Sequence, residues 1–269
     1  MKLILYSLDD PAGCNIAGFV REEGGFVNSG GECLGERVYE RQDVLLVGSK
    51  VNVKDLREFP LKPDVCVVAS RHKSESQTPT LTCHPTGNFG GAELGGEARR
   101  LQLTDANYLR ESLTLLRRKQ AEYVLPYEVS REVTHHGPTD LPFPLLYVEV
   151  GSSERQWGDL KACQAAAEVI LDLMFNGVEQ KKSAIGFGGP HYAPNFNDVT
   201  GEYAVGHIMP KYAAEHMSAG MVSQMIEKTT PKPEAAVVDW KGLRGIEKER
   251  LSGILEELDL PLVKTSDVK

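Results

Sequence analysis

Short apolar segments alternate with amphipathic segments along most of this 269-residue chain, and this alternation restricts the fold more than any other feature. The apolar runs are rich in Val, Ile or Leu and have the length of β-strands. They occupy residues 2–7, 43–48, 64–69, 127–134, 144–150, 183–187, 203–209 and 235–240. Strands that alternate with helices indicate an α/β fold. We expect a mixed or largely parallel sheet with flanking helices, whose central strands are apolar on both faces.

The clearest helix is predicted over residues 159–175, where apolar residues recur every three or four positions. Asp159 is a suitable N-cap and Gly177 a suitable stop. Further helices are predicted over residues 106–121, 213–228 and 245–258. The sequence has no internal repeat, and only the proline-containing loop 229–234 resembles a boundary. We therefore expect residues 1–269 to form one domain, with two interleaved α/β lobes as the alternative.

The charge of the chain limits its partners. A net charge of −8 argues against a protein that coats nucleic acid nonspecifically, because that affinity comes from many phosphate contacts. A few basic clusters could still hold one RNA end, although each is usually solvated surface. These clusters are Arg71-His72-Lys73, Arg99-Arg100, Arg117-Arg118-Lys119 and Lys181-Lys182.

Neither a signal peptide nor a membrane span is expected. The apolar run at residues 3–6 turns acidic at Asp9 and Asp10, and no stretch approaches the roughly 20 apolar residues that a membrane span needs. We therefore expect a cytoplasmic protein with no membrane or DNA partner. The five cysteines are scattered and form no CxxC pair, so we expect free, mostly buried thiols.

Histidines and carboxylates gather directly after the apolar runs. Six of the seven histidines lie in turn-like segments or at strand ends, namely His72, His84, His135, His136, His191 and His207. In open α/β sheets the loops that leave the carboxyl ends of strands converge on ligands. Glu149 lies near the end of an apolar run, where a carboxylate is costly to bury unless it is paired, protonated or bound to metal. We expect these groups to share one water-activating pocket.

His135 and His136 end the alternating run 127–134. Neighbouring residues of a regular strand point to opposite faces, so the two imidazoles cannot both serve one site while the strand continues. On that alternation, His136 continues the polar face of Glu132 and Thr134. Gly137-Pro138 could end the strand early enough to remove this limit.

These groups allow two kinds of hydrolytic chemistry. Imidazoles with Glu149 or Asp140 could hold zinc, usually through three protein ligands and a water. Without metal, a His or Glu could act as general base while Lys211, Asn88 or backbone amides stabilise the oxyanion. The chain has no HExxH, Walker A, GxSxG or complete Rossmann motif. The usual sequence evidence for HExxH zinc proteases, P-loop enzymes and serine α/β-hydrolases is therefore missing.

Several motifs together resemble the archaeal and plant D-aminoacyl-tRNA deacylases over residues 7–213. They are Asp10-Pro11-Ala12-Gly13-Cys14-Asn15-Ile16, Ser70-Arg71-His72, His84-Pro85-Thr86-Gly87-Asn88-Phe89-Gly90, Glu132-Val133-Thr134-His135-His136-Gly137-Pro138-Thr139, Glu149-Val150-Gly151-Ser152-Ser153, Gly188-Gly189-Pro190-His191-Tyr192-Ala193-Pro194 and Gly206-His207-Ile208-Met209-Pro210-Lys211-Tyr212. Single motifs are short, but their order is specific. Cys14 departs from the pattern, since a residue other than a thiol is expected there.

The resemblance implies an enzyme that hydrolyses the ester of D-aminoacyl-tRNA and tolerates many D-amino acids. It also implies zinc as cofactor, with two ions per subunit, and a monomer. The implied α/β fold is similar to peptidyl-tRNA hydrolases and carboxypeptidase-like hydrolases.

Roles can be assigned as a working hypothesis from the strand-end positions. His135, His191 and His207 are the expected metal ligands, and His84 is expected to be a ligand or a catalytic group. Glu149 or His136 is expected to activate water. Substrate contacts are expected from Arg71, Lys73, Asn88 and Lys211.

Two other functions fit the same residues. A zinc-dependent peptidase or amidohydrolase would use this constellation on a peptide, and comparison of peptide and charged-tRNA hydrolysis separates it from a deacylase. A non-catalytic protein that binds a tRNA end would carry structural histidines and no metal.

Overall fold

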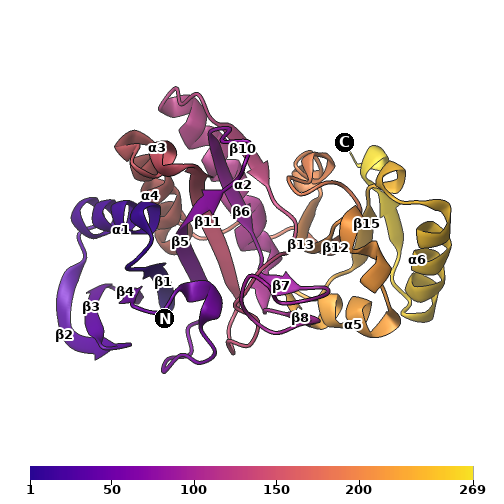
Figure 1. The fold of residues 1–269 in the computed structure, drawn as a ribbon, viewed down its shortest axis with the longest axis horizontal. Coiled ribbons are helices and arrows are strands. Elements are labelled where there is room, and N and C mark those ends of the chain that lie inside the picture. The colour runs from indigo at the N-terminus through magenta and orange to yellow at the C-terminus, as the bar shows by residue number, and fades with distance from the viewer. Residues whose placement is uncertain (269) are drawn as a thin grey trace.

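The computed structural model describes residues 1–268 and has an eight-stranded mixed sheet, on the left of Figure 1, as its larger part. The strand order is β10-β6-β11-β5-β1-β4-β3-β2. Strands β4, β1, β5 and β11 are parallel, whereas β6 and β10 run the opposite way beside β11. The strands are β1 (Lys2–Ser7), β2 (Val27–Cys33), β3 (Glu36–Arg41), β4 (Val44–Ser49), β5 (Cys66–Lys73), β6 (Thr80–His84), β10 (Glu128–Arg131) and β11 (Leu145–Ser152).

Three long helices pack together against one face of this sheet: α1 (Pro11–Glu23), α2 (Ala106–Glu122) and α4 (Leu160–Phe175). The one-turn helix α3 (Glu154–Trp157) follows β11. Alternate strand residues such as Val67, Val148 and Val150 join the helices in the main hydrophobic core. Because side chains alternate along a strand, their neighbours must face the other side of the sheet.

No helix of eight or more residues within 1–268 packs on that other face near β1 and β5. Instead, loop residues such as Leu56, Phe59 and Phe143 cover the strand residues Val68 and Tyr147. Further along the same face, towards the end of β11, polar residues replace the apolar ones. This polar region, which no long helix covers, is where a functional site can form.

A second sheet, on the right of Figure 1, has the order β13-β12-β15-β16 and is entirely parallel. Its elements are β12 (Lys182–Phe187), β13 (Tyr203–Met209), α5 (Ala219–Glu227), β15 (Ala235–Val238), α6 (Gly245–Glu257) and β16 (Leu262–Lys264). Four two-residue strands form two small sheets between the larger ones: β7 (Gly87–Asn88) with β8 (Arg100–Leu101), and β9 (Thr104–Asp105) with β14 (Thr229–Thr230). The large sheets come from successive parts of the chain, and the number of domains stays a prediction.

The sequence prediction of an α/β fold with a mixed sheet and flanking helices is confirmed. Strands β1 and β13 have the predicted bounds, and Asp159 caps α4 as expected. The predicted helix 213–228 is divided: Lys211–His216 forms a 3-10 helix, and Ser218 then caps α5. The likeness to peptidyl-tRNA hydrolases and carboxypeptidases stays a prediction.

Two expectations from composition can also be compared with the structure. All five cysteines are free, and only Cys14 is partly exposed. None of the helices within residues 1–268 combines the length and the hydropathy that a membrane crossing requires.

Candidate active site

The candidate site lies on the helix-free face of the large sheet. Glu149, on β11, is paired in register with Ser70 of β5 and Thr82 of β6. His72 is paired with Gly151, and His84 with Tyr147. Residues paired across strands, and residues two apart along one strand, share a face. His72, His84 and Glu149 therefore project from the same side of three adjacent strands.

This arrangement differs in part from the expectation that strand ends bring the groups together. His84 does end β6, and His191 does follow β12. However, β5 and β11 run opposite to β6, so their carboxyl ends lie at the other edge of the sheet. His72 and Glu149 reach the site from the face of the sheet and not from its edge.

The segment after β10 supplies Glu132, His135 and His136. Strand β10 ends at Arg131, and His136 has a left-handed φ of 40°, so strict alternation does not extend through the two histidines. Their ring centroids lie 4.5 Å apart, and that of His84 lies 4.1 Å from His135 and 4.8 Å from His136. The early end of the strand allows both imidazoles to serve one site.

The second sheet contributes the loop after β12. The Val133 amide donates to the carbonyl oxygen of His191 over 3.0 Å, which joins this loop to the segment after β10. His191 Nε2 lies 2.6 Å from Glu132 Oε2, and the Tyr192 hydroxyl lies 2.9 Å from His72 Nε2. The site is thus built from both large parts of the fold.

Glu132 is at the centre of the cluster and is completely buried. Its Oε2 faces His191 and His135, the latter at 3.5 Å from Nε2, while its Oε1 lies 3.1 Å from His72 Nδ1. Glu149 Oε2 lies 3.5 Å from the same His72 nitrogen and 3.6 Å from His84 Nε2. Two carboxylates and four imidazoles therefore form one continuous polar cluster, and the ring of His136, which lies against those of His84 and His135, is its fifth imidazole.

The carboxylates of the cluster are ionised at neutral pH. Burial alone would raise the pKa of Glu132, but His191 and His72 hold it well below its usual value. Burial also opposes ionisation of Glu149, yet His72 and His84 lower its pKa to about 2. The carboxylates in turn raise the pKa of His72 to about 11 against the effect of burial.

Two other imidazoles, those of His135 and His136, are neutral, because their surroundings disfavour the protonated form. Burial and the neighbouring histidines hold the pKa of His135 well below its usual value. Burial, followed by His84, lowers the pKa of His136 to about 4. A neutral imidazole keeps a lone pair on one ring nitrogen, and that nitrogen can bind a metal.

Backbone carbonyls fix which nitrogen carries the lone pair. Nδ1 lies 3.1 Å from the Pro85 carbonyl oxygen in His84, 2.9 Å from that of Val133 in His135, and 2.6 Å from that of Gly137 in His136. An Nδ1 that donates to a carbonyl leaves Nε2 as the ligand atom, which is the usual arrangement behind metal-bound histidines.

The residues present also have buried atoms that need a partner. Within residues 1–268, the buried atoms His84 Nε2 and Glu132 Oε1 make no well-oriented hydrogen bond. Their nearest charged partners are Glu149 at 3.6 Å and His72 at 3.1 Å, so both atoms remain available to a ligand. Three overlapping groups have ligand atoms within 4.8 Å of one another: His84, His135 and His136; Glu132, His135 and His191; His72, Glu132 and Glu149. The cluster therefore fits a divalent cation.

His207 does not belong to this cluster, although we expected it to be a ligand. It is fully buried on β13, with Nδ1 3.1 Å from Thr134 Oγ1 and Nε2 2.9 Å from the Gln102 carbonyl oxygen. Both ring nitrogens are used by these hydrogen bonds. His207 joins β13 to neighbouring segments and has no lone pair left for a metal.

Asn88, which we expected to contact substrate, lines a pocket beside the cluster and is also bonded within the protein. Its amide nitrogen donates to the carbonyls of Gly95 and Glu97 over 2.8 and 3.1 Å, so it holds the loop 89–97 in shape. Lys73 and Lys211 are exposed, and the Arg71 guanidinium lies 5.1 Å from the centroid of the Trp157 ring. None of these three cations contributes to the buried cluster.

Sequence reasoning placed His72 among the clustered histidines without giving it a role, and it missed Glu132 as a site residue. The alternating pattern predicted that Glu132 lies within a strand, on its polar face. In the structure β10 ends at Arg131, so Glu132 lies outside the strand. Its spacing of three residues from His135 and its place beside a histidine pair were the available signals.

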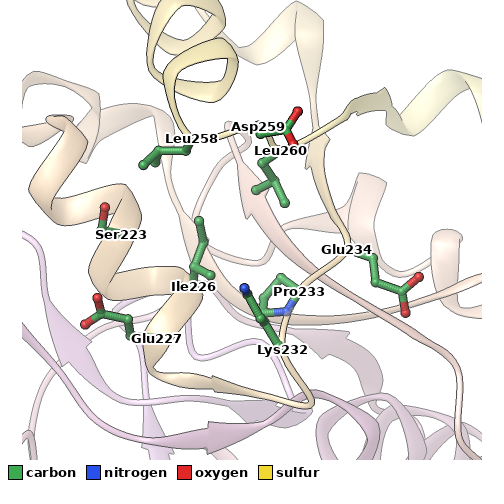
Figure 2. Close-up of a pocket in the computed structure, with 9 residues that line it drawn as sticks. All are labelled: Ser223, Ile226, Glu227, Lys232, Pro233, Glu234, Leu258, Asp259 and Leu260. Carbon is green, nitrogen blue, oxygen red and sulfur yellow. The ribbon is translucent and has the colours of Figure 1, made fainter.

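A pocket of about 370 Å³ opens onto the cluster. Its lining residues include His135, His136 and His191 of the cluster and, outside the cluster, Phe89, Gly90, Tyr212 and His216. Another pocket, of about 400 Å³, lies between α5 and the turn after α6; Figure 2 shows the side chains Ile226, Leu258 and Leu260 gathered around it. That second pocket contains no residue of the cluster, so the first is the one that can bring a substrate to it.

Comparisons with known proteins show which family the chain resembles. A sequence model of the family described as D-aminoacyl-tRNA deacylase matches residues 59–263, which include every residue of the cluster. A protein of Pyrococcus furiosus named D-aminoacyl-tRNA deacylase is 35% identical over 274 residues, which cover 98% of this chain and all of that protein. One of Methanocorpusculum labreanum with the same name is 38% identical, over 99% of this chain and 59% of that protein.

The fold is similar to that of a solved structure as well. A crystal structure described as a conserved protein of unknown function superposes with a TM-score of 0.91 at 26% identity, covering 100% of this chain and 96% of the other. The family model matches more than half of the chain, and the Pyrococcus furiosus relative matches nearly all of it. The chain belongs to the D-aminoacyl-tRNA deacylase family.

Proposed function

We propose that this protein hydrolyses the ester bond between a D-amino acid and tRNA, with the histidine–glutamate cluster as its catalytic centre. The observation that carries the proposal is the convergence of ionised carboxylates and neutral imidazoles beside a pocket, in a chain of this family. An aminoacyl ester is an activated ester, so a positioned water and stabilisation of the oxyanion are the main requirements. The reaction releases free tRNA and a D-amino acid.

We further propose that the cluster holds zinc. Glu132, His135 and His191 form one candidate ligand set, and Glu132, His72 and Glu149 form another, in which a bound ion would take the place of the His72 proton. Imidazole and carboxylate are the ligands that zinc takes in catalytic sites. Zinc bound there would polarise the ester carbonyl and lower the pKa of water towards ~7. Glu132 takes the place that we had expected for His207.

The residues of the chain then have distinct tasks. Glu149 is ionised, and its carboxylate oxygen that does not hold zinc can accept the proton of the attacking water. His84 Nε2 lies beside this carboxylate and can receive or return that proton. His136 offers an unprotonated Nε2 to the substrate, because its Nδ1 donates to the Gly137 carbonyl. The pocket beyond His135 and His136 would receive the aminoacyl group.

The choice of D over L needs only a wall that excludes one side-chain direction, since specificity is a difference between two affinities. Phe89, Gly90 and His216 are candidates for that wall, because they line the pocket and do not belong to the cluster. Lys211 is exposed and directly follows Pro210, which lines the pocket. We propose that Lys211, Arg71 and Lys73 contact the RNA. We assign the activity to the cytoplasm and to a monomer.

The first experiment measures deacylation of D-tyrosyl-tRNA and L-tyrosyl-tRNA, with and without a chelator. We expect hydrolysis of the D-ester alone, its loss with the chelator and its return when zinc is added. Release of tyrosine from small peptides without hydrolysis of D-tyrosyl-tRNA would contradict the proposal and favour a peptidase.

Glu149→Gln tests the role of the carboxylate. We expect kcat to fall by about 10²–10⁴-fold, as for loss of a general base, while KM changes little. Glu154→Gln, which alters an exposed carboxylate on α3, is the control. Equal losses in kcat and in substrate affinity would argue that Glu149 binds substrate instead.

A further inference from the structure

The carboxyl edge of the second sheet carries another pocket beside the loop that holds His191. It has a volume of about 340 Å³ and is lined by Asn195, Asp239, Trp240, Lys241, Lys264, Thr265 and Ser266. We call it the Trp240 pocket. Because β12, β15 and β16 are parallel, their carboxyl ends lie along one edge, which is where parallel sheets bind ligands. The loop after β12 therefore contributes His191 to the catalytic pocket and Asn195 to this one.

Lysines surround the indole of Trp240. Lys248 Nζ and Lys264 Nζ each lie 5.3 Å from its ring centroid, and Lys241 follows it in the chain. Within residues 1–268 none of these three lysines forms an ion pair, whereas Lys119 is paired with two glutamates. In a chain with a net charge of −8, this is a local concentration of unpaired positive charge around an aromatic ring.

Trp240 is partly buried against the core of the second sheet and its ring lines the pocket. An accessible aromatic ring beside flexible cations can bind unpaired nucleic acid, because bases stack on the ring and phosphates meet the cations. The pocket also contains the carboxylate of Asp239, whose Oδ2 accepts a hydrogen bond from Asn195 over 3.0 Å. A carboxylate repels a free phosphate but accepts a hydrogen bond from a cytosine amino group or a ribose hydroxyl. The chemistry therefore favours a nucleotide over an isolated anion.

The Trp240 pocket is closely connected to the catalytic cluster. A Cβ atom at Gly188 would lie 2.8 Å from the Asp239 carbonyl oxygen, and one at Gly242 would lie 2.7 Å from the Gly189 nitrogen. These glycines let the loop after β12 lie directly on the 239–242 turn. Asn195 is four residues from His191, a span of at most about 14 Å even when fully extended. Consecutive nucleotides of one RNA end can reach both places.

We propose that the Trp240 pocket binds an unpaired nucleotide of the tRNA 3′ end while the aminoacyl ester lies at the histidine–glutamate cluster. This inference rests on the proposed function for the identity of the RNA. It assigns Trp240 as a stacking residue and Lys241 and Lys264 as phosphate contacts.

Binding can be measured without any catalysis. Trp157→Phe leaves Trp240 as the only tryptophan, since the chain has two. The probe is a single-stranded RNA tetranucleotide ending in CCA, without an amino acid. We expect saturable quenching of Trp240 fluorescence. In the background of Trp157→Phe, Lys241→Ala with Lys264→Ala should flatten the slope of log affinity against log salt by about 1.4, or ~0.7 for each phosphate contact. Absence of quenching would overturn the proposal.

Kinetics give a second test. We expect Trp240→Leu to raise KM for D-tyrosyl-tRNA about 5- to 100-fold, as for loss of one stacked base, with little change in kcat. Trp240→Phe should recover most of the affinity, which a general folding defect would not. Lys62→Ala, an exposed lysine on the loop covering the large sheet, is the control. Equal KM values for Trp240→Leu and wild type would refute the pocket, whereas loss of all deacylation in the wild type would refute the proposed function alone.

Discussion

Glu132 has two carboxylate oxygens that face different histidines, Oε2 towards His191 and Oε1 towards His72. Replacement of one ligand atom by an amide nitrogen should therefore disturb both proposed zinc positions at once. We expect Glu132→Gln to lower bound zinc and to reduce kcat/KM on the order of 100-fold or more, since even outer-shell partners are worth 10–100-fold. The measurements are metal content by mass spectrometry and steady-state kinetics.

Glu128→Gln provides the matched control, because Glu128 is exposed on the neighbouring strand β10. It should keep both zinc and activity. Full activity of Glu132→Gln at normal zinc content would remove Glu132 from the catalytic centre.

His207 makes stability depend on pH. Burial lowers its pKa from 6.5 to about 3, so it stays neutral in the folded chain at pH values where the unfolded chain binds a proton. The unfolded state then holds more protons, and the free energy of unfolding falls as pH drops from about 6.5 towards 3, by up to about 1.4 kcal/mol per pH unit. Above pH 7 this contribution is fully present.

The difference between wild type and His207→Asn isolates this residue. In urea unfolding, we expect the wild-type advantage at pH 7 to shrink as the pH is lowered to 5. Bound zinc should be unchanged, because both His207 nitrogens are used in hydrogen bonds. A large loss of zinc from His207→Asn would indicate that His207 is a metal ligand after all.

Residue chemistry alone predicted a histidine-rich site, but it did not predict correctly which residues form it. His84, His135, His136, His191 and Glu149 all lie in the cluster. His207 could not be separated from them by sequence, since it also lies towards the end of an apolar run; only the hydrogen bonds to Thr134 and Gln102 reveal its role. Glu132 was missed because the end of β10 depends on tertiary contacts with Asn197 and His191, which are distant in sequence.

At the scale of elements, Asp10 connects a helix to a strand. Its Oδ1 caps α1 by accepting from the Gly13 amide, and its Oδ2 accepts from the Ser70 hydroxyl and the Arg71 amide of β5. Loss of the cap costs about 0.5–2 kcal/mol, and an unsatisfied buried donor costs about 1–3 kcal/mol more. We expect Asp10→Ala to lower the free energy of unfolding by about 2–4 kcal/mol.

Asp105→Ala is the comparison, because Asp105 caps α2 only through the nearby amides of Asn107 and Tyr108. Urea unfolding at pH 7 should show a smaller loss, within about 0.5–2 kcal/mol. Equal losses for the two variants would mean that the contacts of Asp10 with β5 add nothing.

Elements with strong periodicity were predictable, and those with weak signals were not. Helix α4 and strands β1 and β13 follow the apolar pattern of the sequence closely. Helix α1 was missed because Gly13 and Gly18 lower its helix propensity, and its cap and packing compensate. The β2–β3 hairpin was missed because β2 is polar, mostly exposed and contains two glycines.

At the scale of the molecule, the proposed ligands come from both large sheets: His72 and Glu149 from one, His191 from a loop of the other. Zinc should therefore stabilise the two parts together. At a thousandfold excess over its Kd, a ligand of the folded state adds about 4 kcal/mol, which corresponds to a rise of several degrees in Tm.

Single-tryptophan variants can report each part separately. Trp157 lies beside the large sheet, where its indole nitrogen donates to the His72 carbonyl, and Trp240 follows β15 of the second sheet. We expect the Tm from either fluorescence signal to rise equally when zinc is added to chelator-treated protein. A shift in only one signal would show that the metal is held by one part alone.

The pairing of β11 with a parallel strand on one side and an antiparallel strand on the other has a consequence for protein engineering. Displacing β11 by one residue would turn Glu149 towards the helices and bring the valines 148 or 150 to the cluster instead. Grafting the motif loops alone onto another scaffold would therefore transfer Glu132, His135 and His191 but leave behind Glu149, which lies on β11, and the histidines of β5 and β6. A transplant that is to keep the chemistry must carry the three strands β5, β11 and β6 as one block, in register.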